Sequence, residues 1–348
     1  MKSIKALLQN EPMEASAPCR VDMGGTLDLS TFYLPLRHLG PCTFNIALDM
    51  RTRVWLGPHV AGKLKISSSG FQDLEVELAS APFDHPLGLM MAVAANFAAD
   101  GVHMRIDSAS PPRSALGGSS VAAVALVWAF AKLLARQGHP LPEARAIALQ
   151  AHAIEQSVAG VTCGMQDHLA AVYGGVNGWY WSGHLDGRVF EREPIHALEA
   201  QGGFSQHLLV AYCGVPHVSK DVNGTWVRDF LAGRHRALWA QMVSCTRQFI
   251  DALRNGQLSH AQAAMNLETD LRARMTPDVL DEIGRELVAA ALREQCGARF
   301  TGAGGGGCLW ALGTPLQIQA LRPQWQKILS RRAQARILDA AVDHQGVL

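Results

Sequence analysis

A short stretch rich in glycine and serine, Ala115–Ser120, separates two segments of opposite character. Before it, Val102–Ile106 alternates apolar and polar residues, as a strand does. After it, Val121–Leu134 is an apolar run without glycine or proline that carries Lys132 near its end, as a helix does. The order strand, glycine loop, helix start brings unpaired backbone N–H groups and the positive end of a helix dipole to the loop, which suits an anion such as phosphate. A simple turn followed by a helix cap is equally consistent with these residues.

The serines of this stretch add a second expectation. Ser119 and Ser120 are expected to cap the helix and to offer hydroxyls to a metal ion. No Gly-Lys-Ser/Thr follows at the spacing of a Walker P-loop, so any phosphate site here is of another kind.

Composition limits the classes of protein that remain. The chain has 348 residues, of which 48% are hydrophobic and 18% charged, so a globular protein of two domains is expected. Its 31 Lys+Arg against 30 Asp+Glu argue against an electrostatic nucleic-acid binder. The 7 cysteines are scattered without a CxxC pair, which disfavours a disulfide framework or a zinc site and favours a reducing compartment. We expect a cytoplasmic protein that binds neither nucleic acid nor membrane, because residues 1–16 lack the apolar core of a signal peptide and Val121–Leu134 is shorter than the roughly 20 residues that span a bilayer.

Strands and helices alternate irregularly along the chain, which predicts an α+β fold. Expected strands, besides Val102–Ile106, are Cys42–Leu56 and Lys63–Leu78 of an antiparallel sheet, the latter interrupted by a turn at Ser67–Gly70, and Phe204–Cys213. Expected helices, besides Val121–Leu134, are Leu87–Ala99, Glu143–Ser157, Gly224–Ala232, Arg236–Asn255, Ser259–Met275 and Pro277–Gln295. The domain boundary is expected near Gly202-Gly203, which gives domains of residues 1–203 and 204–348.

A second glycine cluster, Thr301–Cys308, contains GxGxxG. The segment after it, Cys308–Leu312, has the character of a strand rather than of the helix that a dinucleotide-binding motif requires. The cluster is therefore interpreted as a turn between two strands, whose glycines let another segment or a ligand approach the backbone.

Three motifs in order resemble those of the GHMP kinases, the superfamily of galactokinase, homoserine kinase, mevalonate kinase and phosphomevalonate kinase. They are Ala17-Pro18-Cys19-Arg20-Val21, the loop Pro112–Ala122, and Thr301–Gly307. Within the superfamily, the chain is most similar to bacterial kinases of D-glycero-D-manno-heptose 7-phosphate. The matching pieces are Gly24-Gly25-Thr26, Gly164-Met165-Gln166-Asp167, Gly174–Asn177, His217-Val218-Ser219 and Asn223–Trp226. Departures from the pattern are Cys19 and Ala115, both at glycine positions, and a segment from Arg20 to Asp28 that is one residue shorter than expected.

The resemblance implies a fold and a set of site residues. The N-terminal half would be of the ribosomal-S5 kind, the C-terminal half a ferredoxin-like α/β plait, and ATP and substrate would meet between them. ATP would be bound by Pro112, Leu116, Gly117, Gly118, Ser119 and Ser120, and Mg²⁺ by Ser120 and Glu155. Asp167 would be the catalytic base, and Arg20 would stabilise charge on the transferred group. The substrate would be bound by Gly25, Thr26, Asp28, Gly164, Gly304 and Gly305.

Each role has a plainer alternative. Glu155 could be a solvated helix residue, Asp167 a helix cap, Arg20 a surface ion-pair partner and Asp28 an acid in a turn. The 14 histidines show no metal-binding spacing, and His168 is expected to be an ordinary polar or core residue.

The resemblance thus implies an ATP- and Mg²⁺-dependent kinase, a monomer or homodimer, that phosphorylates a sugar or sugar phosphate. The anomeric hydroxyl of a heptose 7-phosphate is the first acceptor to consider. Alternatives are a galactose- or L-fucose-type kinase, a decarboxylase of the mevalonate diphosphate type, and a catalytically silent sugar or nucleotide sensor on the same fold.

Overall fold

Two sheets of unequal size organise the chain in a computed structural model that describes residues 3–160, 162–183, 187–198, 203–216 and 219–348. In this part of the chain, the larger sheet has seven strands in the order β4-β3-β5-β2-β6-β7, with β1 also paired to β2. Its strands are β1 (Met13–Met23), β2 (Cys42–Pro58), β3 (Lys63–Ser68), β4 (Leu74–Glu77), β5 (Val102–Ser108), β6 (Val176–Trp181) and β7 (Phe190–Pro194). Its pairs are antiparallel, as expected for the segments Cys42–Leu56 and Lys63–Leu78, except that β3 also pairs with β5 in parallel.

The smaller sheet contains the strands of the second half of the chain. They are β8 (Leu208–Tyr212), β9 (Gly297–Phe300), β10 (Cys308–Leu312) and β11 (Arg336–Leu338), in the order β11-β8-β10-β9 and all antiparallel. Helices separate β8 from β9 and β10 from β11, so this half has the order and connections of the expected ferredoxin-like plait. The α+β fold is thereby confirmed. The expected boundary at 203/204 lies between the two sheets and stays a prediction.

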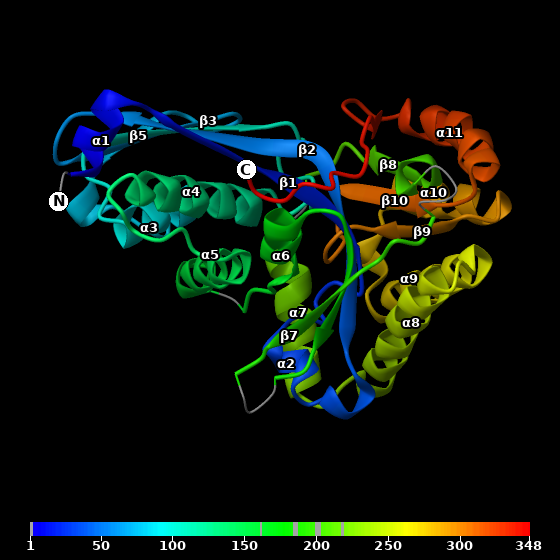
Figure 1. Ribbon diagram of the computed structural model, residues 1–348. Helices are drawn as coiled ribbons and strands as arrows, with labels where there is room; N and C mark the ends of the chain where they lie inside the picture. Colours follow the sequence, from blue (N-terminus) through cyan, green and yellow to red (C-terminus); the bar gives the residue numbers. More distant parts are fainter. Residues whose placement is uncertain (1–2, 161, 184–186, 199–202, 217–218) are drawn as a thin grey trace.

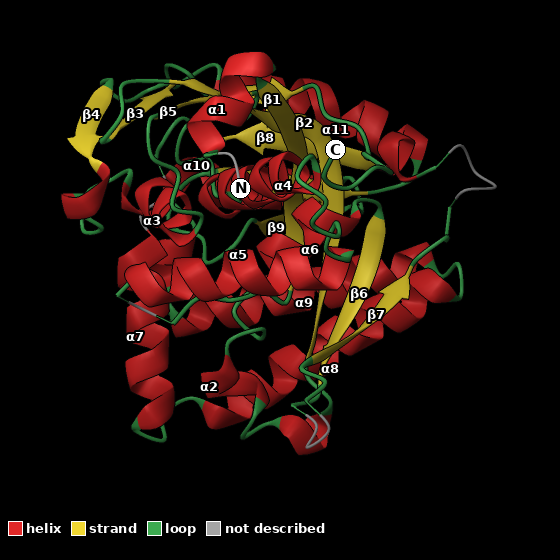
Figure 2. Ribbon diagram, turned by 60° about the vertical axis from the view of Figure 1, so that its left-hand side comes forward, coloured by secondary structure: helices red, strands yellow, loops and turns green. Residues whose placement is uncertain are grey.

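The first half of the chain has the helices α1 (Ile4–Asn10), α2 (Ser30–Tyr33), α3 (Gly88–Asn96), α4 (Gly118–Ala135), α5 (Ala144–Val158) and α6 (Gln166–Tyr173). Helices α4 and α6 contact β1 and β2, α3 and α5 pack on α4, and α2 lies apart from them at the lower end of the molecule in Figure 1 (see also Figure 2). Helix α4 lies against β1 and β2 and is covered in turn by α5, which explains why nearly all of its residues are apolar. By length and hydropathy alone α4 could cross a membrane, but it is the central helix of this core.

The second half adds a helical hairpin, α8 and α9, and three further helices. Its helices are α7 (Ser219–Leu231), α8 (Arg236–Arg254), α9 (Leu258–Met275), α10 (Glu282–Arg293) and α11 (Pro315–Leu329). The expected single helix over 277–295 is wrong: Pro277–Val279 form a 3-10 turn and Asp281 then caps α10. The expected strand at 204–213 likewise begins with a 3-10 turn, Phe204–His207.

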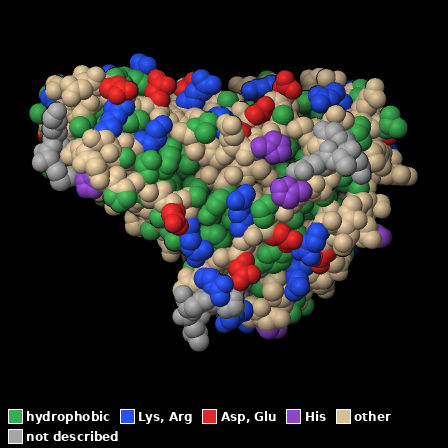
Figure 3. Space-filling view, in the orientation of Figure 1, with side chains coloured by type: hydrophobic (Ala, Val, Ile, Leu, Met, Phe, Trp, Pro, Cys, Tyr) green, Lys and Arg blue, Asp and Glu red, His purple; other side chains and the backbone are tan. Residues whose placement is uncertain are grey.

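One continuous core joins the two halves. Phe44 of β2 packs against Phe249 of α8 and Trp310 of β10, with ring centroids 4.9 and 6.4 Å apart. The C-terminal residues return to the larger sheet, where Leu348 pairs with Ser16 of β1. None of the seven cysteines, all of which lie in the described residues, forms a disulfide. On the face drawn in Figure 3, acidic and basic side chains are interspersed rather than gathered by sign.

Candidate active site

The phosphate loop lies where the sequence predicts it, directly before a long helix. Gly117 is the residue that precedes α4, with φ +82°, a conformation that glycine adopts without strain. Gly118 begins the helix, and a Cβ there would meet only Ser110 Oγ, at 3.9 Å. A side chain at Gly118 would therefore point into open space at the N-terminal end of α4, the end whose unpaired N–H groups suit an anion.

Ser119 and Ser120 do not cap this helix, so that expectation is wrong. They lie within its first turn, and no side chain accepts a hydrogen bond at the cap. Their hydroxyls instead donate to the Glu155 carboxylate, Ser120 at 2.7 Å and Ser119 at 3.3 Å. Helices α4 and α5 thus meet through a group of oxygen atoms beside the phosphate loop.

Glu155 is held as a carboxylate in this group. His168 Nε2 lies 2.8 Å from Glu155 Oε2, and the imidazole is fully buried. Burial opposes ionisation of Glu155, but His168, Ser120 and Ser119 outweigh it and lower the pKa of the carboxyl. Ser120 and Glu155 therefore offer a hydroxyl and a charged carboxylate, the oxygen donors that Mg²⁺ prefers, and they fit the expected ion. His168 is buried as expected, but its position beside Glu155 was missed.

Arg20 and Asp167 form an ion pair at the other side of the loop. Arg20 Nε donates to Asp167 Oδ1 at 2.8 Å, and Nη1 donates to the carbonyl of Ala115. The Arg20 side chain is 5% exposed, which excludes the surface ion pair considered as its alternative. Asp167 is in the first turn of α6 but is not its cap, which is Met165. A Cβ on Gly117 would stand 3.2 Å from Asp167 Oδ2, so this carboxylate lies against the phosphate loop.

Ala115 tolerates the loss of the glycine expected at its position. Its φ of +61° lies in the left-handed region that glycine favours. The hydrogen bond from Arg20 to the Ala115 carbonyl holds the residue there, and a Cβ on Gly307 would stand 2.8 Å from the Ala115 Cβ, so glycine at 307 leaves room for this side chain. Ala115 therefore occupies, with some backbone strain, a conformation that glycine would adopt freely.

Asp28 lies close to Gly164, in the segment that follows β1. A Cβ on Gly164 would stand 1.8 Å from Asp28 Oδ2, so only glycine allows this approach. The backbone N–H of Gln166 donates to the same oxygen at 3.1 Å. Burial raises the pKa of Asp28 to about 6; the Gln166 hydrogen bond opposes the shift and nearby Asp167 adds to it. Although the segment from Arg20 to Asp28 is one residue shorter than expected, it still places the Asp28 carboxyl against Gly164.

The second glycine loop is a turn between β9 and β10, as expected, but not all of its glycines lie near Arg20 and Gly25. Gly302 does, because a Cβ there would be 3.7 Å from Arg20 Nη2, and its carbonyl faces Gly25. A Cβ on Gly304 would instead meet Val279, and the Gly305 N–H donates to the Val279 carbonyl. The structure therefore does not bring Gly304 and Gly305 together with the other expected substrate residues.

Two further residues expected to bind ATP, Leu116 and Pro112, contact other parts of the protein. Leu116 is a core side chain whose carbonyl accepts the Arg20 N–H at 3.2 Å. Pro112 packs on Gly70. His217 and Val218 of the heptose-kinase-like pattern lie outside the described residues.

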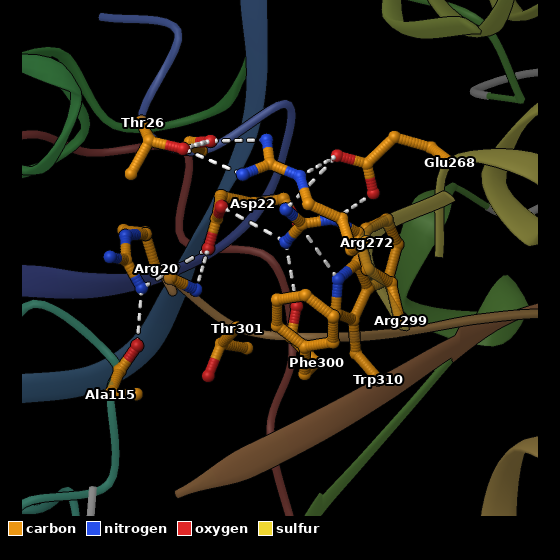
Figure 4. Close-up of polar contacts among 12 residues, drawn as sticks. Arg20, Asp22, Thr26, Ala115, Glu268, Arg272, Arg299, Phe300, Thr301 and Trp310 are labelled. Atoms are coloured by element: carbon orange, nitrogen blue, oxygen red, sulfur yellow. Dashed lines mark hydrogen bonds and ion pairs between the residues drawn. The ribbon is translucent and has the colours of Figure 1, made fainter. Parts of the chain in front are cut away.

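A buried network of charged residues, which the sequence analysis missed, supports this site (Figure 4). Asp22 accepts the Gly302 N–H at 2.7 Å, lies 3.4 Å from Arg20 Nη1 and lies 3.2 Å from Arg299 Nη1. Arg299 in turn pairs with Glu268 at 2.8 Å, and Glu268 with Arg272 at 2.9 Å. All four network residues, Asp22, Glu268, Arg272 and Arg299, have fully buried side chains. The available signal was a charged residue between apolar neighbours in each of two strands, since Asp22 lies between Val21 and Met23 in β1 and Arg299 lies between Ala298 and Phe300 in β9.

Comparisons with known proteins agree with this geometry. Residues 85–175 match the model of the GHMP kinase N-terminal domain. Among curated proteins, none has a significantly similar sequence. The fold resembles Lactococcus lactis galactokinase complexed with galactose, with a TM-score of 0.71 at 15% identity over 99% of each chain. It also resembles a D-glycero-D-manno-heptose 1-phosphate kinase from Bacteroides thetaiotaomicron, with a TM-score of 0.71 at 14% identity over 96% of this chain and 97% of that one.

A third solved structure is similar to the same extent. Streptococcus pneumoniae phosphomevalonate kinase in complex with phosphomevalonate and AMPPNP has a TM-score of 0.73 at 14% identity, over 95% of this chain and all of that one. At such low identity these likenesses establish the fold, while the family model covers the phosphate loop, α5 and α6. Residues 85–175 therefore match the GHMP kinase N-terminal domain, and the chain over nearly its whole length has the fold of these solved kinases.

Proposed function

We propose that this protein is an ATP- and Mg²⁺-dependent kinase that phosphorylates a hydroxyl of a sugar or sugar phosphate. The observation that carries the proposal is the position of Asp167, whose carboxylate lies between Arg20 and the phosphate loop. Phosphoryl transfer needs a phosphate clamp, neutralisation of charge and a group that receives the acceptor's proton. The phosphate loop with the first turn of α4 would be the clamp, Arg20 would neutralise charge, and Asp167 would receive the proton.

Asp167 would orient the acceptor hydroxyl and take its proton as the bond to phosphorus forms. Its Oδ1 is engaged by Arg20, which fixes the carboxylate plane and leaves Oδ2 toward the loop. Arg20 would also balance charge on the phosphoryl oxygens. Ser120 and Glu155 would hold Mg²⁺, which when bound neutralises charge on the phosphate groups.

Asp28 would accept a hydrogen bond from another hydroxyl of the acceptor. A buried carboxyl beside Gly164 suits a polyhydroxyl acceptor, because each sugar hydroxyl can donate one hydrogen bond. The anomeric hydroxyl of a heptose 7-phosphate is the first acceptor we propose, on the motif resemblance. A galactose- or L-fucose-type acceptor is the runner-up.

The test is ADP release measured over a panel of hexoses, heptoses and their phosphates, with mevalonate as a non-sugar acceptor. We expect turnover with one or a few sugars, and product identification by phosphorus NMR will place the new phosphate. Binding of ATP without turnover on any acceptor would contradict the kinase and favour the silent sensor. Turnover with mevalonate alone would contradict the sugar acceptor.

A further inference from the structure

We propose that Arg272, a buried residue of α9 in the second half of the chain, positions the acceptor-binding loop of the first half. This loop is defined here as Gly24–Asp28. The inference rests on the proposed function in one respect, namely that Asp28 contacts the acceptor. Arg272 itself is fully buried and reaches no ligand, so it is a positioning residue rather than a catalytic one.

The guanidinium of Arg272 is fixed on three sides. Its Nε donates to Glu268 at 2.9 Å, while its carbon lies 4.7 and 4.8 Å from the ring centroids of Trp226 and Trp239. Glu268 is held in turn by Arg299, at 2.8 Å. The two terminal nitrogens of Arg272 therefore point in one direction only, toward the acceptor-binding loop (Figure 4).

Both of these nitrogens bind that loop. Nη1 donates to the Thr26 hydroxyl at 2.7 Å, and Nη2 donates to the Gly25 carbonyl at 2.6 Å. These are charge-assisted hydrogen bonds in a buried setting, and a planar fork satisfies both at once. A lysine would keep the charge but not this paired geometry.

The loop needs such a clamp because Thr26 is strained. Its φ is +72°, and a β-branched residue in the left-handed region is a genuine outlier. The strained residue sets the direction of the chain, since its carbonyl accepts the Leu29 N–H and the loop then turns into α2. Asp28 directly precedes Leu29, the donor of this hydrogen bond. The clamp on Gly25 and Thr26 thereby determines where the Asp28 carboxylate lies against Gly164.

The first test needs no substrate. In Arg272→Lys, hydrogen exchange measured by mass spectrometry should become faster over residues 24–29 and stay unchanged over the phosphate loop, 114–120. Thr269→Val is the matched control, because Thr269 is also buried on α9 and its hydroxyl bonds only to the Met265 and Ala298 carbonyls. Unchanged exchange over 24–29, or equal acceleration in the control, would overturn the clamp. If Arg272→Lys does not fold, Thr26→Val, which removes the hydroxyl but keeps the shape, is used instead with the same expectations.

The second test separates positioning from stability. The acceptor KM of Arg272→Lys should rise about tenfold, the size of effect expected for losing one hydrogen bond to a charged group, while the ATP KM stays the same. An equal rise in both KM values, or an acceptor KM equal to that of Thr269→Val, would overturn the positioning role. If the wild-type protein turns over no acceptor, the proposed function has failed, and the exchange experiment still decides whether the clamp exists.

Discussion

Replacing Asp22 by asparagine tests the buried network directly. The network and the adjoining Arg20–Asp167 pair together contain three cationic side chains, Arg20, Arg272 and Arg299, and three carboxylates, Asp22, Glu268 and Asp167, so the charges of these six residues balance. Asp22→Asn leaves one positive charge uncompensated where Asp22 and Arg299 are fully buried. Removing one partner of a buried ion pair typically costs about 3–5 kcal/mol, a large part of the roughly 5–15 kcal/mol that stabilises a domain.

The assay is urea unfolding followed by circular dichroism, with an exposed ion pair as the control. Glu286→Gln removes the partner of Arg331, and both side chains are more than a third exposed, so the loss should stay below about 1 kcal/mol. Adding Arg299→Met to Asp22→Asn restores the balance of charge and should recover part of the stability. A loss for Asp22→Asn no larger than that for Glu286→Gln would refute this account of the network.

Three further predictions concern the site itself. Glu155→Gln should raise the Mg²⁺ concentration needed for half-maximal activity, because it removes the charge that attracts the ion; an unmoved titration would exclude Glu155 as a ligand. Gly118→Val should lower ATP affinity measured by calorimetry without unfolding the protein, since its Cβ has room in the fold but not beside phosphate; unaltered affinity would argue against this clamp. Burial raises the pKa of Asp28 to about 6, so its contribution to the free energy of unfolding is present while it is protonated and is lost as pH rises through 6. Asp28→Asn, which stays neutral, should therefore be more stable than wild type above that pH. Acceptor KM of the wild type should rise below pH 6 as the accepting carboxylate is protonated, and a flat profile would contradict that role.

The local features of the site could be predicted because their causes lie in adjacent residues. An apolar run without glycine or proline predicts α4, and the glycines before it predict a loop at its N-terminus. Likewise, the strand character of Cys308–Leu312 predicts a turn rather than a dinucleotide-binding helix after the second glycine cluster, as β10 confirms. The expected capping by Ser119 and Ser120 was wrong because Glu155, from another helix, offers their hydroxyls a charged acceptor.

The supporting residues could not be predicted, because tertiary structure alone brings them together. Asp22 and Arg299 are separated by 277 positions, and Arg272 and Thr26 by 246. No local pattern tells a buried, paired arginine on an amphipathic helix from an exposed one, and Arg274, two residues after Arg272, is exposed. Backbone strain could not be predicted either, for the same reason. Thr26 and Ala115 adopt left-handed conformations, which their residue types disfavour, because hydrogen bonds from residues distant in sequence hold them.

The most direct test of the central claim, that Asp167 receives the acceptor's proton, is kcat of Asp167→Asn measured together with its melting temperature. Asparagine keeps the size of the side chain and can still accept a hydrogen bond from Arg20, but it cannot take a proton. General-base catalysis typically contributes about 10²–10⁴-fold, so kcat should fall by that order while ATP affinity changes little. The melting temperature should fall moderately, since Asp167 is 22% exposed and its loss leaves Asp22 beside Arg20. Turnover close to that of the wild type, in a folded protein, would contradict the assignment.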